Sequence, residues 1–162
     1  MKINIDTFLK NWQDDFWSED NESNFIKSYE MYCTGYPLLK KANQTDYIRE
    51  VRAIHLELYT IAWQRSVKKK YQYDLLVYIT KDSALKQLNE ISAAYNNSIP
   101  GSASNGGESI RTFSEIMLNA LLPETDYNTP AFDELVDVFF GEYSVLYHEM
   151  CRHLKTVKLT KK

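Results

Sequence analysis

Three observations predict an all-α fold, a compact bundle-like domain of about six to seven helices. Apolar residues recur at three- and four-residue steps over most of the chain, which is the spacing of one helical face. Short polar joints separate the segments that show this spacing. Hydrophobic residues make up 44% of the 162 residues and charged residues 25%, so a single domain spanning residues 1–162 can bury its own core.

The N-terminal part predicts two helices, over residues 4–18 and 22–33, joined by the polar stretch SEDNES. Gly35 and Pro37 end the second helix, because glycine adopts positive φ and proline has no backbone N–H. The apolar residues of the first helix lie on one face and are Ile5, Phe8, Leu9, Trp12 and Phe16.

The next segment, residues 45–70, carries an apolar stripe that includes His55 and ends in the cationic run SVKKK, which suits a helix C-terminus. Residues 73–80 are rich in β-branched and aromatic side chains, which would also fit a strand. Because a lone strand has no obvious pairing partner, we expect a helix there.

Residues 82–95 predict a helix that Asp82 caps. The stretch that follows, residues 96–108, is rich in glycine and serine and predicts a flexible loop. A further helix is expected from residue 108 or 109 to residue 121, with Pro123 closing it.

Thr129 followed by Pro130 is a helix-start signal, an N-cap residue with proline at the first helical position. The last predicted helix covers residues 130–157, and Gly141 is expected to interrupt and bend it. Residues 158–162 then form a basic tail.

Several classes of protein are disfavoured by the composition. The net charge of −3 is too mild to indicate a dedicated nucleic-acid binder. Cys33 and Cys151 are the two cysteines and make no disulfide framework. The N-terminus lacks the apolar core of a signal peptide, and no apolar run reaches the roughly 18 residues of a membrane span, so we expect a cytoplasmic protein. Because the common phosphate-loop, dinucleotide and zinc motifs are absent, no cofactor is predicted.

The stretch YHEMCRHLK, residues 147–155, gathers chemically active side chains in sequence. His148 and His153 are five positions apart, whereas helical metal ligands need a spacing of three or four, so no metal site is predicted from this stretch. A smaller hypothesis is that Glu149 and His153 meet His55 and Glu142 as acid–base groups or as a metal site. The alternative is an ordinary Glu–His pair at the margin of the core.

The segment REVRAIH, residues 49–55, resembles the arginine–histidine pattern of HEPN-type RNases, which are also all-helical. In that pattern the histidine follows the arginine by four to six residues, which Arg49 and His55 match; helical geometry instead favours Arg52 as the partner of His55, and His55 and Arg52 are the candidate catalytic residues of such a ribonuclease. Arg52 and His55 are three positions apart and can share a helical face, while Arg49 and His55 are roughly 120° apart.

Two surfaces are candidates for partner binding. One is basic and combines the cationic run at 65–70 with the C-terminal tail; if the two lie together, their lysines could hold phosphates, and the alternative is a solvated helix end and a solvated tail. The other centres on Trp17, a potential docking anchor beside acidic residues. The lysines of the basic surface are Lys68, Lys69, Lys70, Lys158, Lys161 and Lys162.

The sequence therefore favours a non-catalytic helical protein that binds a macromolecular partner, a protein in the first place, as an adaptor, regulator or inhibitor does. The second hypothesis is a nucleic-acid-binding accessory subunit that uses the basic surface. The third is a small helical enzyme, RNase-like or metal-dependent, centred on His55, His153 and Glu149 with Arg52. Self-association into a homo-oligomer is compatible with each of these hypotheses.

Overall fold

The computed structural model describes residues 1–97 and 106–161, which form seven α-helices and one two-stranded sheet. The all-α prediction is confirmed. The helices are α1 (Ile5–Phe16), α2 (Glu19–Gly35), α3 (Gln44–Ser66), α4 (Asp74–Lys81), α5 (Ser83–Asn97), α6 (Gly106–Leu121) and α7 (Pro130–Thr156). Short 3₁₀ helices join some of them, namely η1 (Pro37–Lys41), η2 (Lys69–Tyr71) and η4 (Glu124–Asp126). No helix in the described ranges is both long and apolar enough to cross a membrane.

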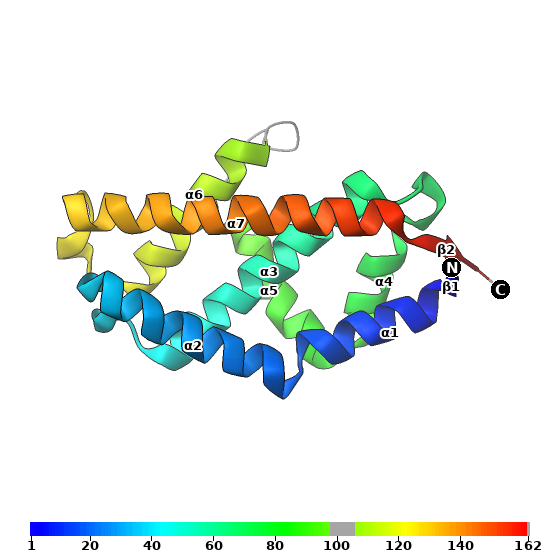
Figure 1. The fold of residues 1–162 in the computed structure, drawn as a ribbon, viewed down its shortest axis with the longest axis horizontal. Coiled ribbons are helices and arrows are strands. Elements are labelled where there is room, and N and C mark those ends of the chain that lie inside the picture. Colours follow the sequence, from blue (N-terminus) through cyan, green and yellow to red (C-terminus); the bar gives the residue numbers. More distant parts are fainter. Residues whose placement is uncertain (98–105, 162) are drawn as a thin grey trace.

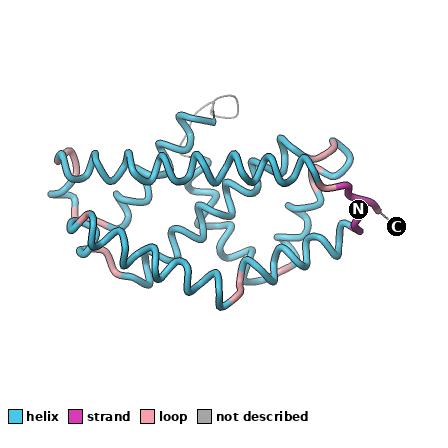
Figure 2. The backbone as a smooth tube through the Cα atoms, in the orientation of Figure 1, coloured by secondary structure: helices cyan, strands magenta, loops and turns pink. Residues whose placement is uncertain are grey.

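The helices form two outer layers with a central helix between them. Helix α7 runs the length of the molecule on one side, and α1 and α2 lie end to end along the other (Figure 1). Helix α3 crosses between these layers and packs against α2, α5, α6 and α7. The tube in Figure 2 shows how short the connecting loops are.

Helix α3 is buried on nearly all sides, whereas the sequence predicted a single apolar stripe. Ala53, Leu56 and Trp63 lie outside that stripe and are nonetheless completely buried. A helix that contacts neighbours on several sides carries apolar residues on several sides. The central position of α3 therefore explains why its amphipathic pattern is weak.

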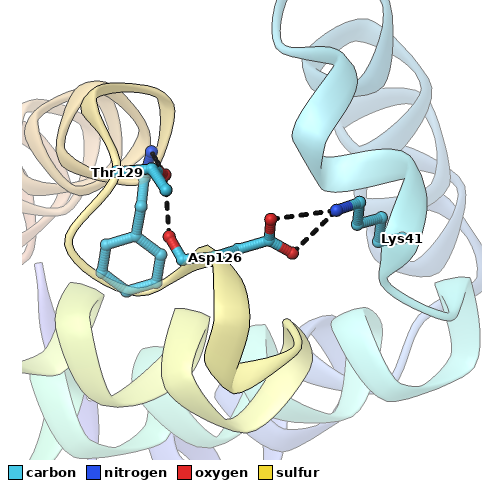
Figure 3. Close-up of polar contacts among 4 residues, drawn as sticks. Lys41, Asp126 and Thr129 are labelled. Carbon is cyan, nitrogen blue, oxygen red and sulfur yellow. Dashed lines mark hydrogen bonds and ion pairs between the residues drawn. The ribbon is translucent and has the colours of Figure 1, made fainter.

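Local capping fixes where the helices begin, and two predicted caps are confirmed. The Asp82 carboxylate accepts the backbone N–H of Leu85 at 2.9 Å, and α5 begins at the next residue, Ser83. The Thr129 hydroxyl accepts the N–H of Phe132 at 3.2 Å, with Pro130 as the first residue of α7. Figure 3 shows Thr129 beside Asp126, whose two carboxylate oxygens each lie 2.9 Å from the Lys41 ammonium and so join η4 to η1.

Helix α3 ends at Ser66, not at Lys70, so the predicted C-terminal boundary is wrong. Val67 has an extended backbone, with φ −90° and ψ 157°. The chain then turns back through η2, where the Trp63 indole N–H donates to the carbonyl of Tyr71 at 2.9 Å. This buried hydrogen bond requires a reversal that a continuous helix could not make. The helix expected over 73–80 is present as α4.

Three of the residues predicted as a basic tail, 158–160, form a strand. Strand β2 (Lys158–Thr160) pairs in parallel with β1 (Lys2–Asn4), with Lys2 opposite Lys158. Two side chains tie this strand in place: the Tyr71 hydroxyl donates to the Leu159 carbonyl at 2.9 Å, and the Thr160 hydroxyl donates to the Ile3 carbonyl at 3.2 Å. Both strands therefore close one end of the molecule.

Two further expectations concern the middle and the end of the chain. Both ends of the loop predicted at 96–108 are helical, because α5 extends to Asn97 and α6 begins at Gly106. Residues 98–105 lie outside the described part of the chain. Helix α7 continues without a break through Gly141.

Candidate functional site

His55 lies partly buried on α3, between α2 and α7. Its ring meets Phe25 edge-on at 5.1 Å between centroids and Tyr143 at 6.1 Å. Desolvation in this aromatic setting lowers the pKa of His55 to about 4, so the imidazole is neutral at pH 7. A neutral imidazole could accept a proton from a substrate. Around His55, however, the rings of Phe25 and Tyr143 occupy positions that a substrate would need.

His153 and Glu149 are exposed on α7 and lie at a different level of the molecule. The His153 ring stacks on Phe8 of α1 at 6.4 Å. Tyr143, the neighbour of His55, is ten residues earlier on the same helix, which corresponds to a rise of about 15 Å. The structure therefore does not bring His153 to His55. Among the described residues, no three His, Cys, Asp or Glu side chains group as metal ligands would.

Glu142, the remaining member of that hypothetical set, is engaged elsewhere. Its carboxylate accepts a hydrogen bond from the Tyr32 hydroxyl, and burial raises the pKa of Glu142 above its ordinary value. His148 is exposed, as its place on the helix predicts. The residues of YHEMCRHLK thus lie at the margin of the core helix and do not converge.

Arg52 and His55 do share a neighbour, Phe25. The Arg52 guanidinium carbon lies 5.6 Å from the Phe25 ring centroid and 5.0 Å from that of Trp17, and one nitrogen lies 3.8 Å from a Glu22 oxygen. Cation–π contact of this kind fixes the α1–α2 joint onto α3. Trp17 is consequently half-buried beneath an arginine, which disfavours its expected role as a docking anchor.

The basic surface does assemble. A pocket of about 440 Å³ opens at the end of the molecule where the two strands meet, and it draws on three separate parts of the chain. The end of α3 contributes Ser66 and Lys68, the end of α7 contributes Lys155, and the two strands contribute Lys2 and Lys158. We call it the basic pocket. The hypothesis of a basic surface required the run at 65–70 and the C-terminal residues to lie together, and Lys68 and Lys158 line the same pocket.

Positive charge in the basic pocket is not balanced by side chains. None of its described lining residues is an aspartate or glutamate, and none of the four lysines has an ion-pair partner among the described residues. The C-terminal ends of α3 and α7 lie here, and each helix end carries roughly half a negative charge. The two together offset about one of the four positive charges.

The other described lysines of the predicted set lie next to residues that line the basic pocket. Lys69 and Lys70 are exposed in η2, with the Lys70 ammonium 4.9 Å from the Tyr71 ring centroid. Lys161 forms an ion pair with Asp74 at 2.9 Å. Lys162 lies outside the described residues.

An exposed apolar face adjoins η2 on the next helix. Tyr73, Leu76 and Val77 are 76%, 44% and 48% exposed, and their spacing of three and one residues places them on one side of α4. The opposite side of α4 is buried through Leu75 and Ile79. We call the three exposed residues the α4 face.

Some of these features escape analysis of the sequence. The contribution of Lys2 depends on the pairing of two strands from opposite ends of the chain, which no local pattern reveals. The α4 face was hidden because residues 73–80 are apolar on both sides. Glu57 also gave no signal, yet it is only 5% exposed on α3, and burial raises its pKa to about 7.

Comparison of the chain with protein-family models, with curated proteins and with solved structures found no match.

Proposed function

We propose that this chain is a non-catalytic binding protein that docks a protein partner on the basic pocket together with the α4 face. The observation that carries the proposal is that the two features are neighbours along the chain. Tyr71 lines the basic pocket, and the α4 face begins at Tyr73, two residues later. Exposed apolar side chains beside unbalanced charge are typical of interaction surfaces.

A protein partner explains both features better than a nucleic acid does. Nucleic-acid backbones are held by cationic and polar groups, which leaves the exposed Leu76 and Val77 without a role. Tyr71, the aromatic residue that lines the basic pocket, is 2% exposed, and its hydroxyl is bonded to Leu159, so it cannot stack on a base. An acidic segment with apolar side chains would match the lysines and the α4 face together.

The nucleic-acid hypothesis remains the second candidate, because four lysines without acidic partners line one pocket. It predicts affinity that falls steeply with salt concentration. The catalytic hypothesis is the third. The separation of His153 from His55 and the aromatic surroundings of His55 support the non-catalytic proposal over it.

Co-purification from cells that express the protein natively tests the proposal. We expect the double variant Leu76→Ser/Val77→Ser to lose its associated protein by at least about tenfold, since apolar anchors dominate protein interfaces. Val145→Ser is the matched control, because Val145 is 59% exposed on α7 and lines neither the basic pocket nor the α4 face. Equal recovery by all three proteins would contradict the proposal. Loss of the partner on nuclease treatment would favour the nucleic-acid hypothesis.

We further propose that the protein acts in the cytoplasm. Cys33 and Cys151 are both free thiols, which a reducing compartment would preserve.

A further inference from the structure

We propose that the basic pocket binds a phosphate monoester that carries an apolar organic group. The proposal goes beyond the docking of a protein, because it concerns the pocket alone and holds for a free organic phosphate as well as for a phosphorylated side chain. It rests on the charge of the pocket, on one buried hydroxyl and on the nature of the pocket walls.

The charge of the basic pocket calls for a dianion. Four lysines line the pocket, and the two helix ends offset about one of their charges. Lys2 and Lys158 are direct partners in adjacent strands, about 4.8 Å apart, so their side chains extend from the same side of the sheet. Like charges in this arrangement destabilise a sheet unless an anion lies between them. A phosphate monoester carries about −1.5 to −2 charges at neutral pH, whereas a carboxylate or a phosphodiester carries one.

Ser66 offers a hydrogen-bond donor that the protein itself does not use. Ser66 lines the basic pocket, and its buried Oγ has no hydrogen-bond partner among the described residues. Buried hydroxyls nearly always have a partner, so an unsatisfied one needs an explanation. A phosphate oxygen that reached this hydroxyl would accept its proton in a charge-assisted hydrogen bond.

The apolar residues that line the basic pocket favour a phosphate that carries an apolar organic group. Val67, Leu154, Val157 and Leu159 line it beside the lysines. Its volume of about 440 Å³ is far larger than a phosphate group and lies within the range of small-molecule sites. Inorganic phosphate would leave this apolar surface uncovered, while an aryl or alkyl phosphate would bury it.

Calorimetric titration at constant ionic strength tests the proposal with defined probes. We expect phenyl phosphate to bind at least about tenfold more tightly than inorganic phosphate, because the ring covers the apolar wall. Methyl phenyl phosphate, a diester with one charge, is expected to bind more weakly than phenyl phosphate. A peptide with a single phosphotyrosine reports on a protein source of the group: tighter binding than phenyl phosphate favours a phosphorylated partner, and equal binding favours a free organic phosphate.

The pH dependence provides a second readout. The second pKa of a phosphate monoester is about 6, so affinity for phenyl phosphate should rise several-fold from pH 5 to pH 7. Benzenesulfonate keeps one charge over this range, and its affinity should stay constant. Ser66→Ala and Lys158→Gln should each weaken phenyl phosphate about tenfold, since each removes one charge-assisted contact. Lys86→Gln, at an exposed position on α5, should leave the affinity unchanged.

Absence of phenyl phosphate binding would overturn the proposal. So would binding that Ser66→Ala and Lys158→Gln leave intact, or that benzenesulfonate matches at pH 7. Failure here is distinguishable from failure of the docking proposal, because the Leu76→Ser/Val77→Ser variant retains the whole basic pocket. That variant should bind phenyl phosphate normally even where it has lost its protein partner.

Discussion

Glu57 and His55 lie two positions apart on α3, and burial moves their pKa values in opposite directions. The pKa of Glu57 rises from 4.5 to about 7, so the folded protein binds more protons at this residue than the unfolded chain does. The pKa of His55 falls from 6.5 to about 4, so the folded protein binds fewer protons there. Between pH 4.5 and pH 6.5 the two effects oppose each other: rising pH lowers the free energy of unfolding through Glu57 and raises it through His55.

The first prediction concerns Glu57→Gln. Below pH 4.5 Glu57 is protonated in both the folded and the unfolded chain and does not oppose folding. Between pH 4.5 and about 7 the carboxyl ionises only in the unfolded chain, so the free energy of unfolding falls as pH rises. Replacing Glu57 by glutamine should therefore raise the free energy of unfolding by about 3 kcal/mol at pH 8 and by little at pH 4.5. Urea unfolding at the two pH values measures this. Glu90→Gln, at an exposed position on α5, should show no such difference. An equal gain in the free energy of unfolding at both pH values would contradict the raised pKa of Glu57.

The second prediction isolates His55. In the Glu57→Gln background, stability should fall as pH drops from 6.5 to about 4, because the unfolded chain takes up a proton that folded His55 refuses. The total loss should be about 3 kcal/mol. Adding His55→Gln should remove this part of the pH dependence in urea unfolding. If the double variant keeps the full slope, other groups cause it.

At the scale of single elements, α4 shows how packing decides between two conformations that the sequence left open. A strand would have placed Val77 on the same face as Leu75 and Ile79, whereas the structure buries those two residues and leaves Val77 48% exposed. Two buried residues four positions apart with an exposed residue midway between them match a helix. The exposed side is therefore a consequence of helical geometry in a segment that is apolar on both sides.

A matched pair of variants tests this arrangement of α4. Leu75→Ala should lower the free energy of unfolding by about 2–5 kcal/mol, because it opens a cavity in the core. Leu76→Ala should change it by no more than about 0.5 kcal/mol, since the side chain is 44% exposed. Thermal or urea unfolding of both variants decides the matter. Similar losses for both would mean that the α4 face is part of the core and is not available to a partner.

Strands β1 and β2 place two like charges, Lys2 and Lys158, opposite each other. Lys2→Glu places a carboxylate opposite Lys158 and should raise the free energy of unfolding by about 0.5–1 kcal/mol at low salt. In 1 M sodium chloride the gain should vanish, because screening acts over only about 3 Å. Urea unfolding at the two salt concentrations measures both effects. A loss of stability at low salt would show that the two lysines do not repel each other.

At the scale of the whole molecule, helices were predictable because their signals are local. Periodic apolar residues, the Asp82 cap and the Thr129–Pro130 start all act within a few residues. The end of α3 was not predictable, because the Trp63–Tyr71 hydrogen bond that reverses the chain depends on tertiary packing. The strand at 158–160 likewise needs a partner from the other end of the chain.

The candidate site was likewise predictable in part. Clustering of lysines near residues 65–70 and at the C-terminus was visible as charge in the sequence, and the basic pocket unites them. Proximity of residues in YHEMCRHLK was misleading, since a helix directs neighbours to different sides. Trp17 appeared accessible in sequence, whereas Arg52 covers it in the fold. The sequence therefore shows where charge and helical periodicity lie, but it does not show which side chains come into contact.

The central claim is that a protein partner docks on the α4 face beside the basic pocket, and photo-crosslinking in native cells tests it most directly. Tyr73 is replaced by p-benzoylphenylalanine, which keeps an aromatic ring at a position 76% exposed. Met31, 61% exposed on α2, is replaced in the same way as the control. The account predicts a discrete, nuclease-resistant protein adduct at position 73 that is absent at position 31. No adduct at 73, an equal adduct at both positions, or an adduct that nuclease removes would contradict it.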